Sequence, residues 1–377
     1  MNKILLVSNY YSSYISAGTS KRTRELKKGL SKLGWKCKVL TIKRKSLPLS
    51  KEKDSSDITI IKTLSEKYPI PFIKNLKILD LIKSSDVVHI IDHWSILNLI
   101  CVILCLLSKT PYIYSPCGAL KPEGRNIFIK KIYNFFFLNL ISRNASYFFA
   151  ITKKEREEIK LITKSNVQII LLPNGIWKES KKKIVMKSLQ NYSKLNVPSK
   201  YILFVGRLSI IKGPDILLNA FMKSKIKNEY YLIFAGPDDN MKAKMEETIK
   251  KSPNNKKVLF LGPISSTKRD FLMKKAIITV IPSRKEAMSL VALESSMVGT
   301  PFLASKFCGL DDFEENSSGY ICDGDPISIS KKLETLLEDL DSIKETGKNA
   351  QNYVLSHYSW ESIIKKMNLY LNFLIDK

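Results

Sequence analysis

Short apolar runs alternate with longer amphipathic segments along the chain, and the alternation occurs in two separate series. An apolar run of strand length followed by a segment with helical periodicity is typical of a β–α unit. The first series predicts strands at Lys3–Ser8, Lys36–Ile42, Ile58–Lys62, Asp86–Ile91, Tyr112–Ser115, Tyr147–Ala150 and Val167–Leu172. The second predicts strands at Tyr201–Val205, Tyr231–Ala235, Val258–Leu261, Ile277–Ile281 and Pro301–Ala304. Strands joined by helices form parallel sheets covered on both faces, so we expect two doubly wound, Rossmann-like α/β domains.

A polar stretch rich in Lys, Ser and Asn separates the two series and lies between Pro173 and Pro198. Such a composition is typical of a linker between domains. We therefore expect a first domain at residues 1–175, a linker at 176–198 and a second domain at 199–356, with a final amphipathic helix in 357–377. A chain of 377 residues is long enough for two domains of ordinary size.

The charge is strongly unbalanced: 62 Lys and Arg against 35 Asp and Glu give a net charge of +27. This predicts an anionic partner, which could be nucleic acid, an acidic membrane or a phosphorylated small molecule. The stretch Lys21–Lys45 carries eleven basic residues and one Glu, which fits a solvated face or a surface for acidic lipid headgroups. Basic and aromatic residues also mix in Lys121–Arg143, which fits a membrane interface or an ordinary packed helix.

Six cysteines are scattered without a CxxC pair, and Cys101 and Cys105 share a helix face, so we expect reduced thiols in a cytoplasmic protein. The most apolar segment, Ile96–Leu107, is shorter than the roughly 20 residues that span a bilayer, and we interpret it as a core helix. The three histidines do not form a set of metal ligands. His93, just past the expected strand Asp86–Ile91, is either a packed side chain or a ligand contact.

Candidate chemistry follows the ends of the strands in the second series. Arg207 and Lys212 follow the first strand between Gly206 and Gly213, and a helix begins at Pro214. Two cations beside a helix N-terminus suit a diphosphate, while the alternative is a solvated basic loop.

The stretch PSRKEAMSLVALESSMVGTP places Glu286 in a loop after an apolar strand, and Ser289 as the N-cap of a helix that carries Glu294. Gly236 and Gly262 end two neighbouring strands. In open α/β sheets ligands bind at this edge, so the cations and carboxylates together indicate a site for a nucleotide sugar.

Four segments, taken as a set, resemble family 4 retaining glycosyltransferases: GRLSIIKG, AGPD, FLGPIS and PSRKEAMSLVALESSMVGTP. In the last of them, Glu286 and Glu294 form the E-x7-E pattern. The resemblance implies the GT-B fold, in which two Rossmann-like domains face each other across a cleft and the C-terminal helix returns to the first domain. It also implies catalysis by charge and positioning without a bound metal or other cofactor.

The same resemblance implies a role for each matching residue. Arg207 and Lys212 would neutralise the donor diphosphate, Glu286 would bind the transferred sugar and Glu294 the ribose hydroxyls. The donor-binding residues that it implies are Gly18, Gly206, Gly236, Ile264, Ala287, Met288, Ser289, Leu290 and Glu294.

The chain departs from the family pattern at three places. Ala287 and Ser289 stand where the family often has Gly, and Ala17 stands where a second Gly is common in the first loop. Ile91 stands at the usual position of a histidine, which leaves His93 as the candidate catalytic substitute.

From these observations we expect a retaining enzyme that moves a hexose from a UDP- or GDP-sugar to a saccharide or lipid-linked saccharide, in cell-surface polysaccharide or lipopolysaccharide synthesis. We expect it in the cytoplasm, with peripheral contact to the inner face of an anionic membrane left open. A sugar-nucleotide epimerase on the same fold is the alternative enzyme. A basic nucleic-acid-binding protein is the non-enzymatic alternative, although no zinc-finger, RRM or helix-turn-helix signature is present.

Overall fold

The computed structural model describes residues 1–11, 18–43, 56–64, 70–72, 77–123, 126–163, 166–178, 197–251 and 255–376. These residues form two compact units: unit 1, Met1–Asn174 with Trp360–Lys377, and unit 2, Gly175–Ser359. Most of the linker predicted at 176–198, and the position of Ala17 in the first loop, lie outside the described residues.

Unit 1 is built on a seven-stranded sheet in the order β3-β2-β1-β4-β5-β6-β7, and all of its strand pairs are parallel. Its strands are β1 (Lys3–Ser8), β2 (Lys36–Ile42), β3 (Ile58–Ile61), β4 (Val87–Ile91), β5 (Tyr112–Ser115), β6 (Tyr147–Ala150) and β7 (Ile169–Leu171). All five residues of β4 are buried, as expected for a central strand covered on both faces. The strand predictions for the first series are therefore confirmed, with small shifts at the ends.

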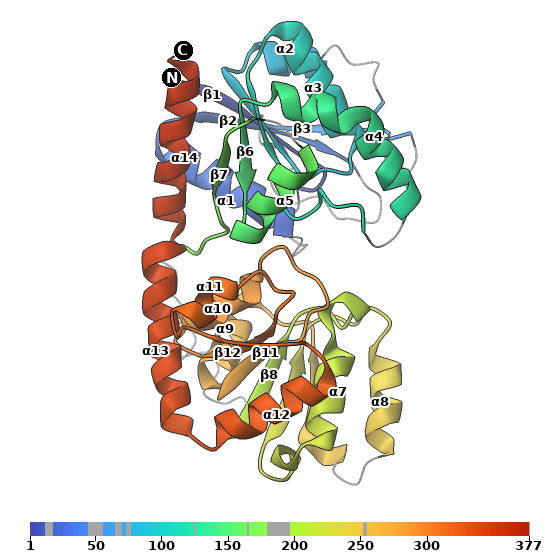
Figure 1. Cartoon of the computed structure of the whole chain (residues 1–377), viewed down its shortest axis with the longest axis vertical. Helices are drawn as coiled ribbons and strands as arrows, with labels where there is room; N and C mark the ends of the chain where they lie inside the picture. Colours follow the sequence, from blue (N-terminus) through green and yellow to red (C-terminus); the bar gives the residue numbers. More distant parts are fainter. Residues whose placement is uncertain are drawn as a thin grey trace. The chain divides into compact units, whose positions relative to one another are not determined.

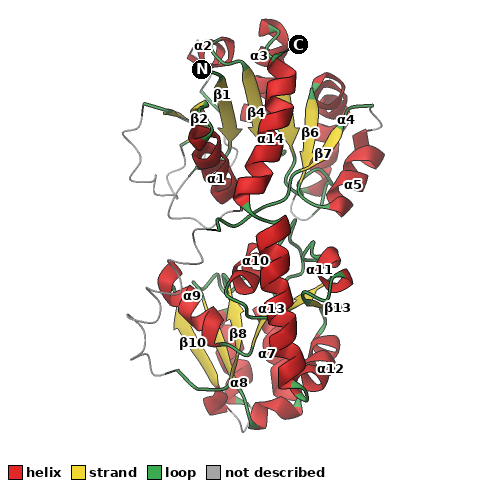
Figure 2. Cartoon of the chain, turned by 90° about the vertical axis from the view of Figure 1, so that its left-hand side faces the viewer, coloured by secondary structure: helices red, strands yellow, loops and turns green. Residues whose placement is uncertain are grey.

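Helices cover both faces of this sheet (Figures 1 and 2). One face carries α1 (Gly18–Lys32) and α14 (Trp360–Ile375), which pack so closely that a Cβ on Gly29 would lie 1.8 Å from Ile364 Cδ1. The other face carries α2 (Lys77–Lys83), α3 (Ile96–Ser108), α4 (Ile127–Asn144) and α5 (Lys153–Thr163), which share one apolar core. The C-terminal helix thus belongs to unit 1, as the resemblance implies.

Unit 2 is built on a six-stranded parallel sheet in the order β10-β9-β8-β11-β12-β13. Its strands are β8 (Tyr201–Val205), β9 (Tyr231–Ala235), β10 (Val258–Gly262), β11 (Ile278–Ile281), β12 (Phe302–Ser305) and β13 (Tyr320–Cys322). The sequence analysis missed β13, a three-residue strand between Gly319 and Gly324 that is too short for a recognisable apolar pattern.

Two layers of helices cover the sheet of unit 2 (Figure 1). One core contains α7 (Pro214–Lys223), α8 (Lys242–Lys250) and α12 (Pro326–Leu337). The opposite core contains α9 (Ser266–Lys275), with α10 (Leu290–Met297) packed against it and α13 (Leu340–His357) outside α10. A short helix, α11 (Asp311–Glu315), precedes β13, and one-turn 3₁₀ helices lie at Ile210–Lys212, Lys225–Asn228 and Asn255–Lys257.

The strand order of both sheets reverses direction next to the first strand. In unit 1 this places β1 beside β4, and in unit 2 it places β8 beside β11. At such a switch point the two loops at the carboxyl ends of the strands diverge to opposite faces and leave a crevice where ligands bind. Arg207 follows β8 and Glu286 follows β11, so the switch point of unit 2 is where the sequence places its candidate chemistry.

Candidate functional site

The loops after β8 and β11 are held together by backbone contacts. The amide of Arg284 donates to the carbonyl oxygen of Ile211 at 2.8 Å. Gly213 has a φ of +67°, and a Cβ added to it would lie 2.2 Å from the carbonyl oxygen of Pro282. Only glycine allows this approach, so the two loops form one rigid support for the side chains that they carry.

Lys212 and Glu286 meet directly across this junction. The Lys212 ammonium lies 2.9 Å from Glu286 Oε1, and the Glu286 side chain is only 10% exposed. The Ser283 hydroxyl donates to the same oxygen at 2.6 Å, and the Glu286 amide donates to the carbonyl oxygen of Phe307 at 2.9 Å. The carboxylate is therefore fixed in orientation, while the half-buried ammonium keeps donor capacity for an anion.

Arg207 lies on the same loop as Lys212 but points to a different neighbour. Its guanidinium Nη1 lies 3.2 Å from Asp239 Oδ2 in the loop after β9, and its side chain is 63% exposed. An exposed ion pair of this kind contributes little to stability, so Arg207 can exchange Asp239 for another anion at small free-energy cost. The structure brings together Lys212 and Glu286 but does not join Arg207 to them.

Glu294 lies on α10, where it forms an ion pair with Arg269 of α9 at 3.1 Å. Its side chain is 12% exposed. Arg269 also contacts Asp270 at 3.0 Å, and these two carboxylates raise the pKa of the guanidinium despite the opposing effect of burial. Arg269 therefore orients the Glu294 carboxylate, whose oxygens can accept hydrogen bonds from hydroxyl groups.

Two serine hydroxyls close to these groups are buried without a partner among the residues that the structure describes. They are Ser209 Oγ, on the loop after β8, and Ser289 Oγ, at the start of α10. The sequence predicts Ser289 as the N-cap of α10, and it occupies that position, but its side chain makes no capping hydrogen bond. Because a buried hydroxyl without a partner is unfavourable, both groups are potential contacts for a bound ligand.

The other predicted donor-binding residues of unit 2 lie after strands β8, β9, β10 and β11, and Gly18 lies in unit 1. Gly236 approaches Gly206 so closely that a Cβ on Gly236 would lie 1.9 Å from the Gly206 carbonyl oxygen. Met288 is buried, and Ala287, Leu290 and Ile264 are half-buried. Gly18 begins α1 in unit 1, and a Cβ added there would meet no atom within 4 Å.

His93, the catalytic candidate of unit 1, is fully buried. Its Nδ1 lies 2.9 Å from the Tyr114 hydroxyl and its Nε2 lies 2.8 Å from Asn134 Oδ1, and the ring also stacks edge-on with Trp94 at 4.5 Å between centroids. Burial lowers its pKa to about 4. His93 is therefore a packed side chain with both ring nitrogens hydrogen-bonded. Of the two interpretations that the sequence allowed, a packed side chain or a ligand contact, the structure supports the first.

This burial predicts a dependence of stability on pH. The folded-state pKa of His93 is about 4 against 6.5 for the free side chain, so the unfolded chain binds the proton more strongly. The contribution of His93 to the free energy of unfolding is fully present above pH 6.5. It falls by about 3 kcal/mol as the pH drops from 6.5 toward 4. Thermal unfolding midpoints of His93→Gln should vary less over this range than those of the wild type, and the exposed His357→Gln is the control. Equal pH dependence in His93→Gln and wild type would contradict the buried neutral imidazole.

Sequence reasoning missed two residues that orient the carboxylates, Arg269 and Ser283. Arg269 lies in a run of polar residues on α9 that is unremarkable by itself. Its approach to Glu294 depends on how α9 packs on α10. Ser283, in contrast, is three residues before Glu286 in a tight loop, a spacing from which a local hydrogen bond could have been anticipated.

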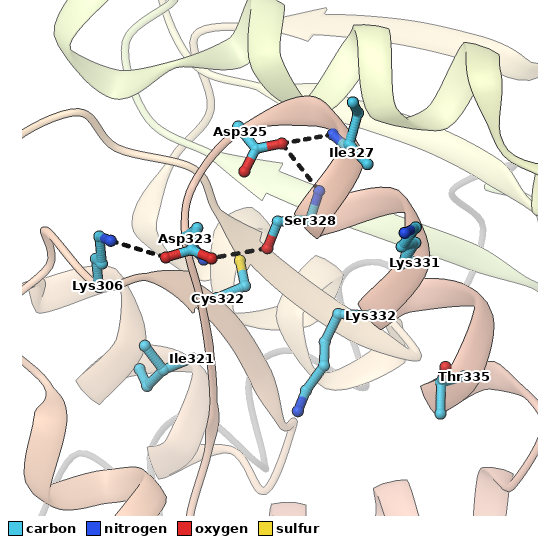
Figure 3. A pocket seen from close by; sticks show the side chains of 10 residues that line it. All are labelled: Lys306, Ile321, Cys322, Asp323, Asp325, Ile327, Ser328, Lys331, Lys332 and Thr335. Carbon is cyan, nitrogen blue, oxygen red and sulfur yellow. Dashed lines mark hydrogen bonds and ion pairs between the residues drawn. The ribbon is translucent and has the colours of Figure 1, made fainter.

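A separate depression of about 780 Å³ lies beside β13 and the start of α12 (Figure 3). The residues that line it are Lys306, Ile321, Cys322, Asp323, Asp325, Ile327, Ser328, Lys331, Lys332 and Thr335. Asp323 already binds Lys306 at 2.7 Å, and Asp325 caps α12 by accepting from the amides of Ile327 and Ser328. None of the predicted site residues lines this depression, and they lie instead at the carboxyl ends of the strands of unit 2 or in unit 1.

Comparison with known proteins finds sequence similarity in the second half of the chain. Residues 186–353 match the family model described as Glycosyl transferases group 1. An uncharacterized glycosyltransferase of Methanocaldococcus jannaschii is 33% identical over 174 residues, which are 45% of this chain and 44% of the relative. The D-inositol 3-phosphate glycosyltransferase of Corynebacterium kroppenstedtii is 32% identical over 185 residues, 46% of this chain and 41% of that protein. The matches thus span less than half the length of these relatives.

Solved structures extend the similarity in fold to the whole chain. Sucrose-phosphate synthase from Thermosynechococcus elongatus superposes with a TM-score of 0.75 at 19% identity and covers 100% of both chains. Anabaena HepE, solved with UDP, gives a TM-score of 0.79 at 16% identity over 99% of this chain and 100% of HepE. WaaG, a glycosyltransferase involved in lipopolysaccharide biosynthesis, gives 0.66 at 15% identity over 97% and 98% of the two chains. These similarities confirm the predicted GT-B fold with two Rossmann-like domains.

Proposed function

We propose that this protein is a family 4 retaining glycosyltransferase that transfers a hexose from a UDP- or GDP-sugar to a saccharide or lipid-linked saccharide. The observation that carries the proposal is the Lys212–Glu286 pair at the switch point of unit 2, within the residues that match the group 1 glycosyltransferase family model. A cation suited to phosphate and an oriented carboxylate suited to sugar hydroxyls are the two kinds of group that a sugar diphosphate requires.

In the proposed reaction the bond between the sugar C1 and the diphosphate oxygen breaks, and a bond from C1 to the acceptor oxygen forms on the same face. Lys212 and Arg207 would neutralise the charge that develops on the departing diphosphate, without a resident metal. The acceptor hydroxyl would give its proton to the leaving phosphate oxygen. Glu286 would fix the sugar through its hydroxyls, and Glu294, held by Arg269, would fix the ribose.

The acceptor that we propose belongs to cell-surface polysaccharide or lipopolysaccharide synthesis at the cytoplasmic side of the membrane. The net charge of +27 supports contact with an anionic membrane, where a lipid-linked saccharide would be found. Within the described ranges, no helix combines the length and apolar character that crossing a bilayer requires.

A thermal-shift screen against UDP, GDP, ADP and their sugar conjugates tests the donor part of the proposal. A ligand that binds only the native state at about 100 times its Kd stabilises that state by about 2.7 kcal/mol, so one nucleotide series should raise the unfolding midpoint by a few degrees. Product analysis with the stabilising sugar nucleotide then separates the enzymes, because an epimerase leaves the sugar on its nucleotide. Absence of a shift with every nucleotide, together with salt-dependent binding to DNA, would contradict the proposal and favour a nucleic-acid-binding protein.

A further inference from the structure

Helix α4 of unit 1 carries apolar side chains on its outer side as well as on its inner side. Its sequence, IFIKKIYNFFFLNLISRN, contains no acidic residue, and it buries Leu138 and Ile141 in the core of unit 1. Its outer side should therefore be polar if it met only water. Instead, the side chains of Phe128, Phe135 and Phe136 are 75%, 80% and 64% exposed.

These phenylalanines form one outward face. Phe128, Ile132, Phe135 and Phe136 follow helical spacing and lie on the same side of α4, where the polar Asn139 is also exposed. Ile132 and Ile129 are 41% and 52% exposed. Phe135 and Phe136 contact each other edge-on at 5.1 Å between ring centroids. We call this set, Phe128, Ile129, Ile132, Phe135 and Phe136, the α4 face. A cluster of exposed apolar side chains of this kind usually marks an interaction site.

The neighbouring helix α3 continues the same character. It packs against α4 in unit 1, and Figure 1 shows the two helices side by side at the edge of this unit. Leu107 and Ile103 of α3 are 74% and 40% exposed. Exposed apolar side chains therefore occur on both of these adjacent helices and are not limited to α4.

Basic residues accompany the α4 face. Lys131 and Arg143 are exposed on α4, and Lys109 is exposed at the end of α3. Lys130 lies 5.3 Å above the Trp94 ring. Aromatic and apolar side chains next to cations, on a helix without acidic residues, suit contact with the headgroup region of an anionic membrane.

The basic run Lys21–Lys45, the other candidate surface for acidic lipid headgroups, is less suitable for contact with a membrane. Arg22 is fully buried, where it donates to the carbonyl oxygens of Leu172 and Pro173. Lys27 is paired with Asp57 at 3.7 Å. This run also lacks an exposed aromatic cluster in its described part.

We propose that the α4 face binds the surface of an anionic phospholipid membrane, with its phenylalanines inserted among the acyl chains and its cations at the headgroups. A second copy of the chain is a less suitable occupant, because two molecules of net charge +27 repel each other while an anionic bilayer attracts each of them. The inference locates the membrane contact of the proposed function on α4, but it does not depend on transferase activity.

Sedimentation of the full chain with lipid vesicles tests this inference. The wild type should bind vesicles of phosphatidylcholine mixed with phosphatidylglycerol, and bind vesicles of phosphatidylcholine alone far less. In the double variant Phe128→Ser, Phe135→Ser we expect at least about tenfold weaker binding, since both side chains leave the acyl region. The matched control is Leu369→Ser, Phe373→Ser on α14, which also removes two side chains that are 69% and 65% exposed and should bind as the wild type does.

Three outcomes would overturn the inference. If the α4 variant and the wild type bound vesicles equally, the binding would be nonspecific adsorption by charge and would not involve the α4 face. Loss of binding in the α14 control alone would place the membrane contact on that helix. Absence of vesicle binding combined with a wild-type dimer that becomes monomeric in the α4 variant, measured by light scattering, would make the α4 face an interface between copies. Nucleotide thermal shifts measured on the same variants test the proposed donor site separately. A failure of the proposed function is therefore distinguishable from a failure of membrane binding.

Discussion

Replacing Glu286 with Gln should lower the rate of sugar transfer by about a hundredfold. The variant keeps the shape of the side chain but removes the charge that Lys212 contacts at 2.9 Å and that Ser283 supports at 2.6 Å. Charged hydrogen bonds to sugar hydroxyls contribute about 1.5–3 kcal/mol each, and their loss at the reacting sugar accounts for the expected factor. The measurement is the release of nucleoside diphosphate in the presence of the donor found by thermal shift.

The matched control is Glu246→Gln on α8. Glu246 is also paired with a lysine of unit 2, Lys242 at 3.5 Å, but both partners are exposed on the outside of the helix. Exposed pairs of this kind contribute little, so this variant should transfer sugar at the wild-type rate. Full activity of Glu286→Gln would show that Glu286 does not take part in sugar transfer, and a lowered unfolding midpoint would then make its pair with Lys212 a structural contact.

The meeting of Lys212 and Glu286 illustrates what the sequence could predict. Both residues follow apolar strands of the second series, and the carboxyl ends of parallel strands lie at one edge of a sheet. The β–α alternation therefore predicted the architecture and the edge that carries the site. It did not predict the side-chain partners: Arg207 binds Asp239 and Glu294 binds Arg269, because these pairs depend on loop shape and helix packing.

His93 and α4 show where sequence patterns lose their predictive power. The partners of His93 are Tyr114, which is 21 residues away, and Asn134, which is 41 residues away, so its burial depends on the assembly of β5 and α4 around it. The apolar sequence of α4 fits a buried helix as well as a membrane-facing one. Only the fold shows that Phe128 and Phe135 remain outside the core.

The second large effect is expected for stability, in Gly236→Ala. Gly236 has a φ of +151°, and an added Cβ would lie 1.9 Å from the carbonyl oxygen and 2.6 Å from the carbonyl carbon of Gly206. Both are backbone atoms, so no side-chain rotation can relieve the clash. Backbone strain and overpacking together should lower the free energy of unfolding of unit 2 by about 4 kcal/mol. Chemical denaturation followed by circular dichroism measures the loss.

Gly262→Ala separates the clash from the effect of backbone conformation alone. Gly262 ends β10 in the same sheet and has a φ of +65°, but a Cβ added there would meet no atom within 4 Å. The left-handed conformation by itself costs about 1–2 kcal/mol for a residue with a Cβ, so Gly262→Ala should be clearly more stable than Gly236→Ala. If the two variants unfold at the same denaturant concentration, the loops after β8 and β9 are not in close contact. A contact between these loops would then not support the positions of Arg207 and Lys212.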